Sequence, residues 1–463
     1  MLSKVTNKVV HFIGFCAVGF LTVAPAHANS LQESVVQALN HHPSVEAAVA
    51  NRDALRQERR EQWANHFPTL NIRGAGGRVF GDNSTSRGLL VTRGSAYSYL
   101  WEGSATLTQP LFNGFETFNR VKASDVRVSS AQSSIAEVRE SLALSTVLAY
   151  MDVLRASTSL ASVQKHDDKI DDYIDRIGSM VEQGGAEESM SVQAKDIGAQ
   201  LKNTYHNLKG QSLSAEVTFS ELTGFYPDET FNMPPSIFFK DLPDDVEIAV
   251  SYALEHHPSL RAAQLEAQAL KHDVDADKQF YYPDFDGELS YLKRDQREEI
   301  GGEATDAKAV VRVNWDLSVA GGQAARVRQS KERARESLAQ QEETKRRIER
   351  DVRIAYNEIQ TAQNQLMVLK ERRDLNVELV QNYNSQFEAA RINLLQLLQS
   401  ENALFNTELS LKNGTFRHVA AKFNALASMG VLQNALGVGL RRDRELPAPP
   451  PYVLKGSESA DAR

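Results

Sequence analysis

The sequence predicts a mainly α-helical chain with a smaller β part, built from two tandem copies of one unit. The stretch ALNHHPSVEAA at residues 38–48 returns as ALEHHPSLRAA at residues 253–263. Residues 323–389 contain neither proline nor glycine, the two residues that helix interiors avoid. One shorter stretch in each copy alternates apolar and polar residues, which is the period of a strand with one apolar face.

The amino-terminal residues 1–28 are expected to form a signal peptide. Lys4 and Lys8 precede a mostly apolar run at residues 12–24, and Ala26-His27-Ala28 is typical of a signal peptidase site. The run is too short for a spanning helix. Cys16, the only cysteine, lies inside it and does not fit a lipidation motif, because Phe15 stands where a small residue is expected. The exported chain is therefore expected to have no disulfide and no lipid anchor.

The charge balance is acidic, with 52 Lys and Arg against 60 Asp and Glu and a formal net charge of −8. Loss of the signal peptide would lower it to −10, because two lysines and no acid would be removed. A nucleic-acid partner is not expected for such a chain.

Each copy is expected to contain a helix, two strands, a long helix and a second helix. The first repeat spans residues 29–224 and the second 245–440, because residues 120–124 match residues 326–330 and Gly224 matches Gly430. Residues 225–244, which hold four prolines, are the expected linker, and residues 441–463 are an expected flexible tail.

The β part of each copy is expected to be a hairpin. Its partner strands begin at Leu70 and Phe285, and mostly polar turns are expected at residues 81–95 and 294–306. The alternating apolar positions of the other two strands are Tyr97, Tyr99, Trp101, Ala105 and Leu107 in the first copy and Val311, Val313, Trp315 and Leu317 in the second.

The long helix of the second copy carries a heptad pattern, because its apolar residues fall at alternating steps of four and three. They are Ile348, Val352, Ala355, Ile359, Ala362, Leu366, Leu369, Val380, Tyr383 and Phe387. This spacing favours a left-handed coiled coil with neighbouring helices. The long helices are expected to end at residues 183–185 and 389–391, and a second helix then runs back from about Glu187 and Leu394.

Four strands with one apolar face cannot span a membrane alone, because open edges would leave backbone groups unpaired in lipid. Closed barrels need about eight strands or more. Several chains would therefore have to pool their strands. An exported chain with spanning strands and no spanning helix points to the bacterial outer membrane.

The chain resembles the TolC family of outer-membrane export channels. The resemblance covers most of it and is carried by the duplicated Ala-Leu-x-x-x-Pro element, the strand-to-helix junction at residues 109–114 (QPLFNG) and the matching helix tips. It implies a homotrimer in outer-membrane lipid, with a 12-strand transmembrane β-barrel above an α-barrel of long antiparallel helical hairpins. It also implies docking to a periplasmic adaptor and an inner-membrane ABC or proton-driven transporter, with no cofactor and no catalytic residue.

The same resemblance suggests where the periplasmic entrance lies. Multidrug-exporting relatives carry two acidic residues one turn apart on the last periplasmic helix, and matching the tips places Gln396 and Gln399 there. An amide ring lacks fixed negative charge, and Arg391 adds positive charge nearby. The glutamines could instead cap a solvated helix face. Gly184, Gly185 and Ala390 at the hairpin tips are candidate adaptor contacts.

Other motifs favour structural roles. The resemblance implies that the His-His-Pro elements are helix joints, where proline interrupts the backbone ladder, and not metal sites. Asp273, Asp275 and Asp277 start like a calcium loop, but Lys278 replaces the required glycine. Asp168, Asp171, Asp172 and Asp175 are read as a solvated face, with a cation-attracting or adaptor-contacting surface as the alternative.

We therefore expect an outer-membrane channel that serves type I protein secretion, with the outer component of a multidrug efflux pump as the alternative. A structural coiled-coil envelope stalk is the alternative from another class. The entrance is expected to open when the two helical hairpins splay outward.

Overall fold

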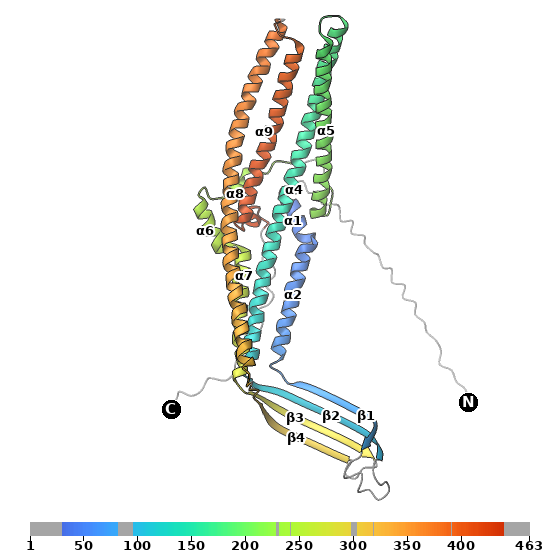
Figure 1. Cartoon of the computed structure of the whole chain (residues 1–463), viewed down its shortest axis with the longest axis vertical. Coiled ribbons are helices and arrows are strands. Elements are labelled where there is room, and N and C mark those ends of the chain that lie inside the picture. The colour runs from blue at the N-terminus through green and yellow to red at the C-terminus, as the bar shows by residue number, and fades with distance from the viewer. Residues whose placement is uncertain are drawn as a thin grey trace, which may run out of the picture.

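The computed structural model describes residues 30–81, 96–227, 231–240, 242–297, 303–317, 319–389 and 391–438. The predicted signal peptide with Cys16, most of the first hairpin turn, Ala390 and the predicted tail lie outside the described residues. Long helices run along most of the molecule, and a four-stranded antiparallel sheet lies at one end (Figure 1). The predicted mainly α-helical fold with a β part is confirmed.

The same order of elements occurs twice along the chain. The first series is α1 (Leu31–His41), α2 (Pro43–Ala64), β1 (Thr69–Gly81), β2 (Ala96–Asn113), α4 (Glu116–Glu182) and α5 (Glu188–Thr223). After the short helix η1 (Ser236–Phe239), the second is α6 (Val246–His256), α7 (Pro258–Asp277), η2 (Lys278–Tyr281), β3 (Asp284–Arg297), β4 (Glu303–Asn314), α8 (Gly322–Glu388), α9 (Leu394–Ser428) and α10 (Leu432–Ala435). Both α4 and α8 contain 67 residues, which corresponds to rods of about 100 Å.

The sheet has the order β1-β2-β3-β4, so every strand lies beside its neighbour in sequence. The expected turn at residues 294–306 is shorter than predicted, because Arg294 pairs with Ala304 and Leu292 with Asp306 inside the ladder. The second alternating strand also ends earlier than predicted, at Asn314, so Trp315 and Leu317 follow it. Asn314 pairs with Asp284, the first residue of β3, and the preceding Pro283 has no N–H to continue the ladder.

Both His-His-Pro elements lie at helix joints. His42 is the N-cap of α2 and His257 the N-cap of α7, and each is followed by proline at the first helical position, where a missing N–H costs nothing. The Nδ1 atom of each ring accepts the backbone N–H two residues on, from Ser44 and from Ser259, both at 3.2 Å. The predicted structural role of these elements is confirmed by this capping geometry.

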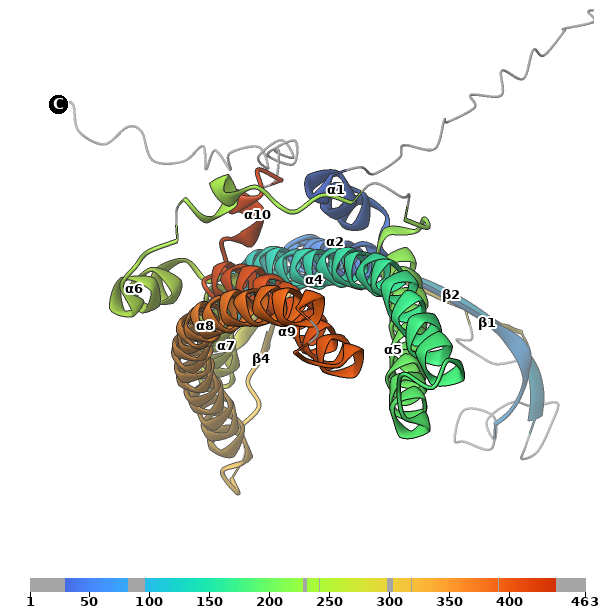
Figure 2. The ribbon, with the colours of Figure 1, turned by 90° about the horizontal axis from the view of Figure 1, so that it is seen from above.

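The long helices form one curved layer. Near the sheet α4 packs against α2 and α7, and α8 packs against α7; toward the tips α4 packs against α5 and α9, and α8 against α9. Seen along its length, the layer is an arc, with α1, α6 and α10 on the convex side (Figure 2). Each chain therefore presents a concave surface.

Among the described residues, three apolar cores hold this layer together. The largest joins α1, α4, α9 and the linker, where the hydroxyl of buried Tyr150 donates to Asn232 O at 2.9 Å and accepts Asn232 N–H at 3.0 Å. A second lies toward the tips, and Tyr383 and Phe387 of the predicted heptad pattern pack against it. A third includes buried Ile348 and Val352 of the same pattern. The apolar stripe of α8 thus faces its neighbours, as the spacing predicts.

Candidate functional site

The described strands give the sheet one apolar and one polar face. Residues on the same face lie opposite one another across all four strands, as in the row Ile72, Ala105, Tyr291 and Ala307. The apolar face exposes large side chains, which are Leu70, Ile72, Tyr99, Trp101, Leu289, Tyr291, Val311 and Val313. A broad exposed apolar surface of this kind marks a contact with lipid or protein.

The opposite face carries hydroxyl and charged side chains. One of its rows places Asn71, Thr106, Ser290 and Lys308 side by side. The described part of this face holds two ion pairs. Arg294 Nε lies 3.1 Å from Glu102 Oε2 across β2 and β3, and Arg312 pairs with Glu288 across β3 and β4.

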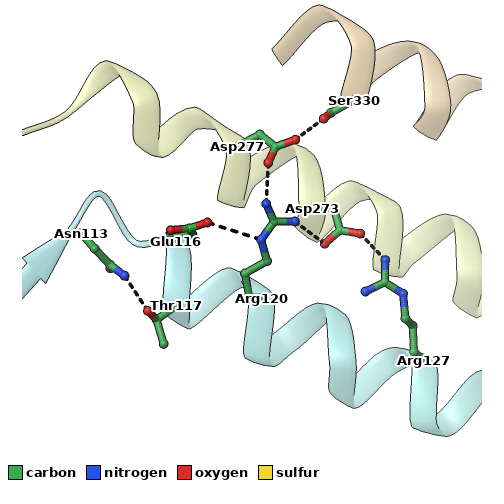
Figure 3. Close-up of polar contacts among 8 residues, drawn as sticks. All are labelled: Asn113, Glu116, Thr117, Arg120, Arg127, Asp273, Asp277 and Ser330. Atoms are coloured by element: carbon green, nitrogen blue, oxygen red, sulfur yellow. Dashed lines mark hydrogen bonds and ion pairs between the residues drawn. The ribbon is translucent and has the colours of Figure 1, made fainter. Parts of the chain in front are cut away.

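An ionic cluster connects helices α4 and α7 beside the point where α4 leaves the sheet (Figure 3). Arg120 of α4 donates to Asp273 Oδ1 at 3.1 Å and to Asp277 Oδ1 at 2.6 Å, both on α7. Its Nε lies 3.6 Å from Glu116 Oε1, and burial raises the pKa of that carboxyl although Arg120 opposes the shift. The Arg120 guanidinium therefore lies among three carboxylates at the point where the chain leaves the strands, and its positive charge offsets part of theirs.

Further contacts extend this cluster to a third helix. Arg127 pairs with Asp273, and the Ser330 hydroxyl of α8 donates to Asp277. Asn113, the last residue of β2, donates to the Thr117 hydroxyl at 2.5 Å (Figure 3). Asp273 and Asp277 lie on helix α7, not in a loop, and their oxygens are occupied by arginine and serine. The calcium-loop pattern of the sequence therefore does not form a calcium-binding loop. The contacts of the cluster fix the direction in which α4 leaves the sheet.

The predicted entrance residues lie at the start of α9. Gln396 and Gln399 are exposed one turn apart, while Leu394, Leu395, Leu397 and Leu398 around them are buried. The Gln396 N–H donates to Asn393 Oδ1 at 2.9 Å, so the cap is Asn393 and the glutamine side chains are free to face outward. Arg391 is also exposed, and its N–H donates to Gln386 O at 2.9 Å.

The other predicted tip residues lie between α4 and α5. Gly184 has φ of 75°, which only glycine adopts without strain, and the Gly185 N–H donates to Met180 O at 2.8 Å. Their counterpart Ala390 lies outside the described residues. Both tips lie at the end of the molecule opposite the sheet (Figure 1).

Sequence reasoning missed a polar contact between the two helical hairpins. Lys169 Nζ on α4 lies 2.5 Å from Glu401 Oε1 on α9. One turn away, the His166 ring stacks on Phe405 with centroids 4.1 Å apart and planes 5° apart. Burial, together with the nearby positive charge of Lys169, lowers the pKa of His166 to about 4. Nothing in the local sequence signals these pairs, because their members lie more than 200 residues apart.

The predicted acidic face of α4 is solvated. Asp168, Asp171, Asp172 and Asp175 are all exposed. Asp172 pairs with Arg176 at 2.9 Å and Asp171 with Lys202 at 3.7 Å, so part of the negative charge is already balanced. The described residues hold no cluster of three or more His, Cys, Asp or Glu side chains arranged for a metal ion.

Within the described part of the chain, no helix combines the length and the apolar character needed to cross a membrane.

Comparison with known proteins gives consistent matches. A family model described as outer membrane efflux protein matches residues 35–225 and 249–429. The chain is 20% identical over 354 residues to the outer membrane efflux protein BepC of Brucella suis biovar 1 (strain 1330), a match that covers 76% of each protein.

Solved structures are similar as well. The CmeC outer membrane channel of Campylobacter jejuni matches with 12% identity and a TM-score of 0.74, over 86% of this chain and 85% of that one. The open state of the Neisseria gonorrhoeae MtrE outer membrane channel matches with 16% identity and a TM-score of 0.72, over 87% and 89%.

Proposed function

The chain belongs to the outer membrane efflux protein family, and from this premise we propose that it forms the outer-membrane duct of a type I protein secretion system. It is an outer-membrane efflux channel protein with a periplasmic helical part, and it is not an enzyme.

The proposed assembly is a homotrimer. In the described sheet β1 and β4 are edge strands, and each has one row of backbone groups without a partner strand. Such edges are not tolerated in lipid, so strands from identical chains must join them. Three chains would supply twelve strands, with the apolar face toward lipid and the polar face toward the lumen. The concave arcs of helices would then close into a tunnel, with residues 29–224 and 245–440 as two repeats joined by residues 225–244.

The proposed cargo is a polypeptide, and the observation that supports it is the exposed amide pair Gln396 and Gln399. A ring of carboxylates at an entrance concentrates cations and opposes acidic segments. Amides donate and accept hydrogen bonds without a fixed charge, so a chain with both signs of charge can pass. In this system an inner-membrane ABC transporter and a periplasmic adaptor would deliver the cargo.

The second candidate is the outer component of a multidrug efflux pump. The similarity to BepC, whose description is an efflux protein, favours it. Deleting the gene separates the two candidates. Type I secretion predicts that one large secreted protein is retained in the cell with drug susceptibility unchanged. Normal secretion together with drug hypersensitivity would establish the pump and reject our first proposal.

We propose that the entrance opens by outward movement of the two hairpins. Cross-linking of Gln396→Cys between chains should abolish export, because the α9 tips could no longer separate. Cys16, the only natural cysteine, lies in the predicted signal peptide, so the new thiol would be unique in the mature chain. Addition of a reductant should restore export. Full export by the cross-linked protein would reject this gate.

A further inference from the structure

The polar face of the sheet carries nearly equal numbers of opposite charges in the described residues. Five acidic and four basic side chains lie on this face, at positions that alternate with the apolar ones. They are Glu102, Asp284, Asp286, Glu288 and Asp306, and Arg73, Arg294, Lys308 and Arg312. The described part of this face thus has a net charge of only −1, although the whole chain has a net charge of −8.

Four of these nine charged residues form two direct pairs. Glu102 and Arg294 are register partners on β2 and β3, and their side chains are 34% and 45% exposed. Glu288 pairs with Arg312, which lies opposite Asp286 on the neighbouring strand. Cross-strand pairs of this kind hold the two charges at fixed positions on one face. The carboxylates of Glu102 and Glu288 are therefore neutralised where they lie and not by a distant charge.

The pairing of these charges determines the electrostatic field that acts on an ion in the lumen. The field of an exposed charge extends over a Debye length, about 10 Å at 0.1 M salt and about 30 Å at 0.01 M. At low salt an unbalanced ring of charges would thus act across the lumen of a twelve-stranded barrel and favour ions of the opposite sign. A closely spaced pair of opposite charges has a much shorter reach.

We infer that Glu102 and Arg294 are specificity-determining residues, whose pairing keeps the pore from selecting between cations and anions. The inference depends on the proposed function, because the polar face encloses a lumen only in a closed barrel. In a trimer, loss of one partner would expose three charges of one sign at the same height.

The test is single-channel recording in planar lipid bilayers, with a tenfold KCl gradient and about 0.01 M salt on the dilute side. The reversal potential gives the ratio of cation to anion permeability. The wild type should be weakly selective. Arg294→Gln should raise the ratio severalfold, because Glu102 is unmasked, and Glu102→Gln should lower it severalfold. The double variant should return to the wild-type value.

Lys293→Gln is the matched control. It removes the same charge one residue away, but Lys293 lies on the apolar face of the sheet beside Gly103. Its permeability ratio should equal that of the wild type. Equal shifts in Lys293→Gln and Arg294→Gln would overturn the inference, because total charge and not the lumen pair would then set selectivity.

Three outcomes are therefore distinguishable. An absence of conductance steps in the wild type would contradict the proposed function itself. Steps of wild-type size with an unchanged reversal potential in both single variants would overturn the inference and leave the channel intact. A strongly selective wild type would also overturn it. Equal heat resistance of the trimer on gels identifies variants that have folded normally.

Discussion

The Lys169 ammonium and the Glu401 carboxylate form an ion pair of 2.5 Å between α4 and α9. The Glu401 side chain is 10% exposed and that of Lys169 50%, so the carboxylate depends on this lysine for its balancing charge. The pair links the first helical hairpin to the second, and hairpin separation is the proposed opening movement.

Lys169→Met should weaken the contact between the hairpins. It leaves a buried carboxylate without a partner, which costs about 1–3 kcal/mol. Bilayer recordings should show longer open times for this variant. Lys202→Met is the control, because its partner Asp171 lies at 3.7 Å and both side chains are more than half exposed, so the loss should be below about 1 kcal/mol. Equal open times in the two variants would contradict the role of the Lys169 pair.

Acid should destabilise the contact between α4 and α9 through His166. Its pKa is lowered from 6.5 to about 4 by burial. As pH falls between these values, the unfolded chain takes up a proton that the folded chain does not, so stability decreases by about 1–3 kcal/mol. His166→Phe keeps the ring stacked on Phe405 but removes the titration. Urea unfolding in detergent should show a smaller loss between pH 7 and pH 4 for the variant, whereas identical losses would exclude His166 as a source.

Two glycines at equivalent places in the repeats should respond differently to alanine. Gly224 and Gly430 have φ of 83° and 74°, so each substitution costs about 1 kcal/mol in backbone strain. A Cβ at Gly430 would lie 2.8 Å from Pro258 Cδ, while one at Gly224 meets nothing within 4 Å. Gly430→Ala should therefore lower the free energy of unfolding by a further ~1–3 kcal/mol. Equal losses of unfolding free energy in the two variants would show that the backbone at His257 and Pro258 shifts to make room for the new Cβ.

Removal of the Arg120 side-chain charge should loosen the junction in Figure 3. Asp273 and Asp277 are only 13% and 12% exposed, so Arg120→Met should destabilise the fold by about 2–4 kcal/mol. Arg59→Met is the control variant. Among the described residues, Arg59 pairs only with Asp125, whose side chain is 50% exposed, so loss of this ion pair should lower the stability of the fold by less than ~1 kcal/mol. Thermal unfolding of the two variants in detergent measures both losses. If Arg120→Met destabilised the fold as little as Arg59→Met, the charge of Arg127 alone would be enough to stabilise the carboxylates of the cluster.

Much of the fold follows from local patterns. Residues 323–389 lack helix breakers, and α8 spans Gly322–Glu388. The alternating residues of the strands mark the apolar face, and proline marks both helix joints. The strand prediction failed at Trp315 and Leu317, because alternation continues there while the partner strand β3 begins only at Asp284. A strand ends where its neighbour ends, which the sequence of one strand does not contain.

The functional site was less predictable. Matching the tips of the repeats located Gln396 and Gln399, and the structure places them on an exposed face of α9; their place in an entrance ring stays a prediction. Lys169 and Glu401 are 232 residues apart, and Arg120 lies 153 residues from Asp273. From the sequence alone, each of these four residues is indistinguishable from an ordinary solvent-exposed charged residue. Only the packing of α4 against α7 and α9 brings them together.

The length of α4 and α8 makes them levers. A rigid rod of about 100 Å that pivots by one degree at its base displaces its far end by nearly 2 Å. Sub-ångström adjustments in the arginine cluster beside the sheet would thus be amplified into several ångströms of travel at the opposite extremity. Because of this length, a small rotation at the base of α4 or α8 moves the far end of the helix by several ångströms while every backbone hydrogen bond of the helix stays intact.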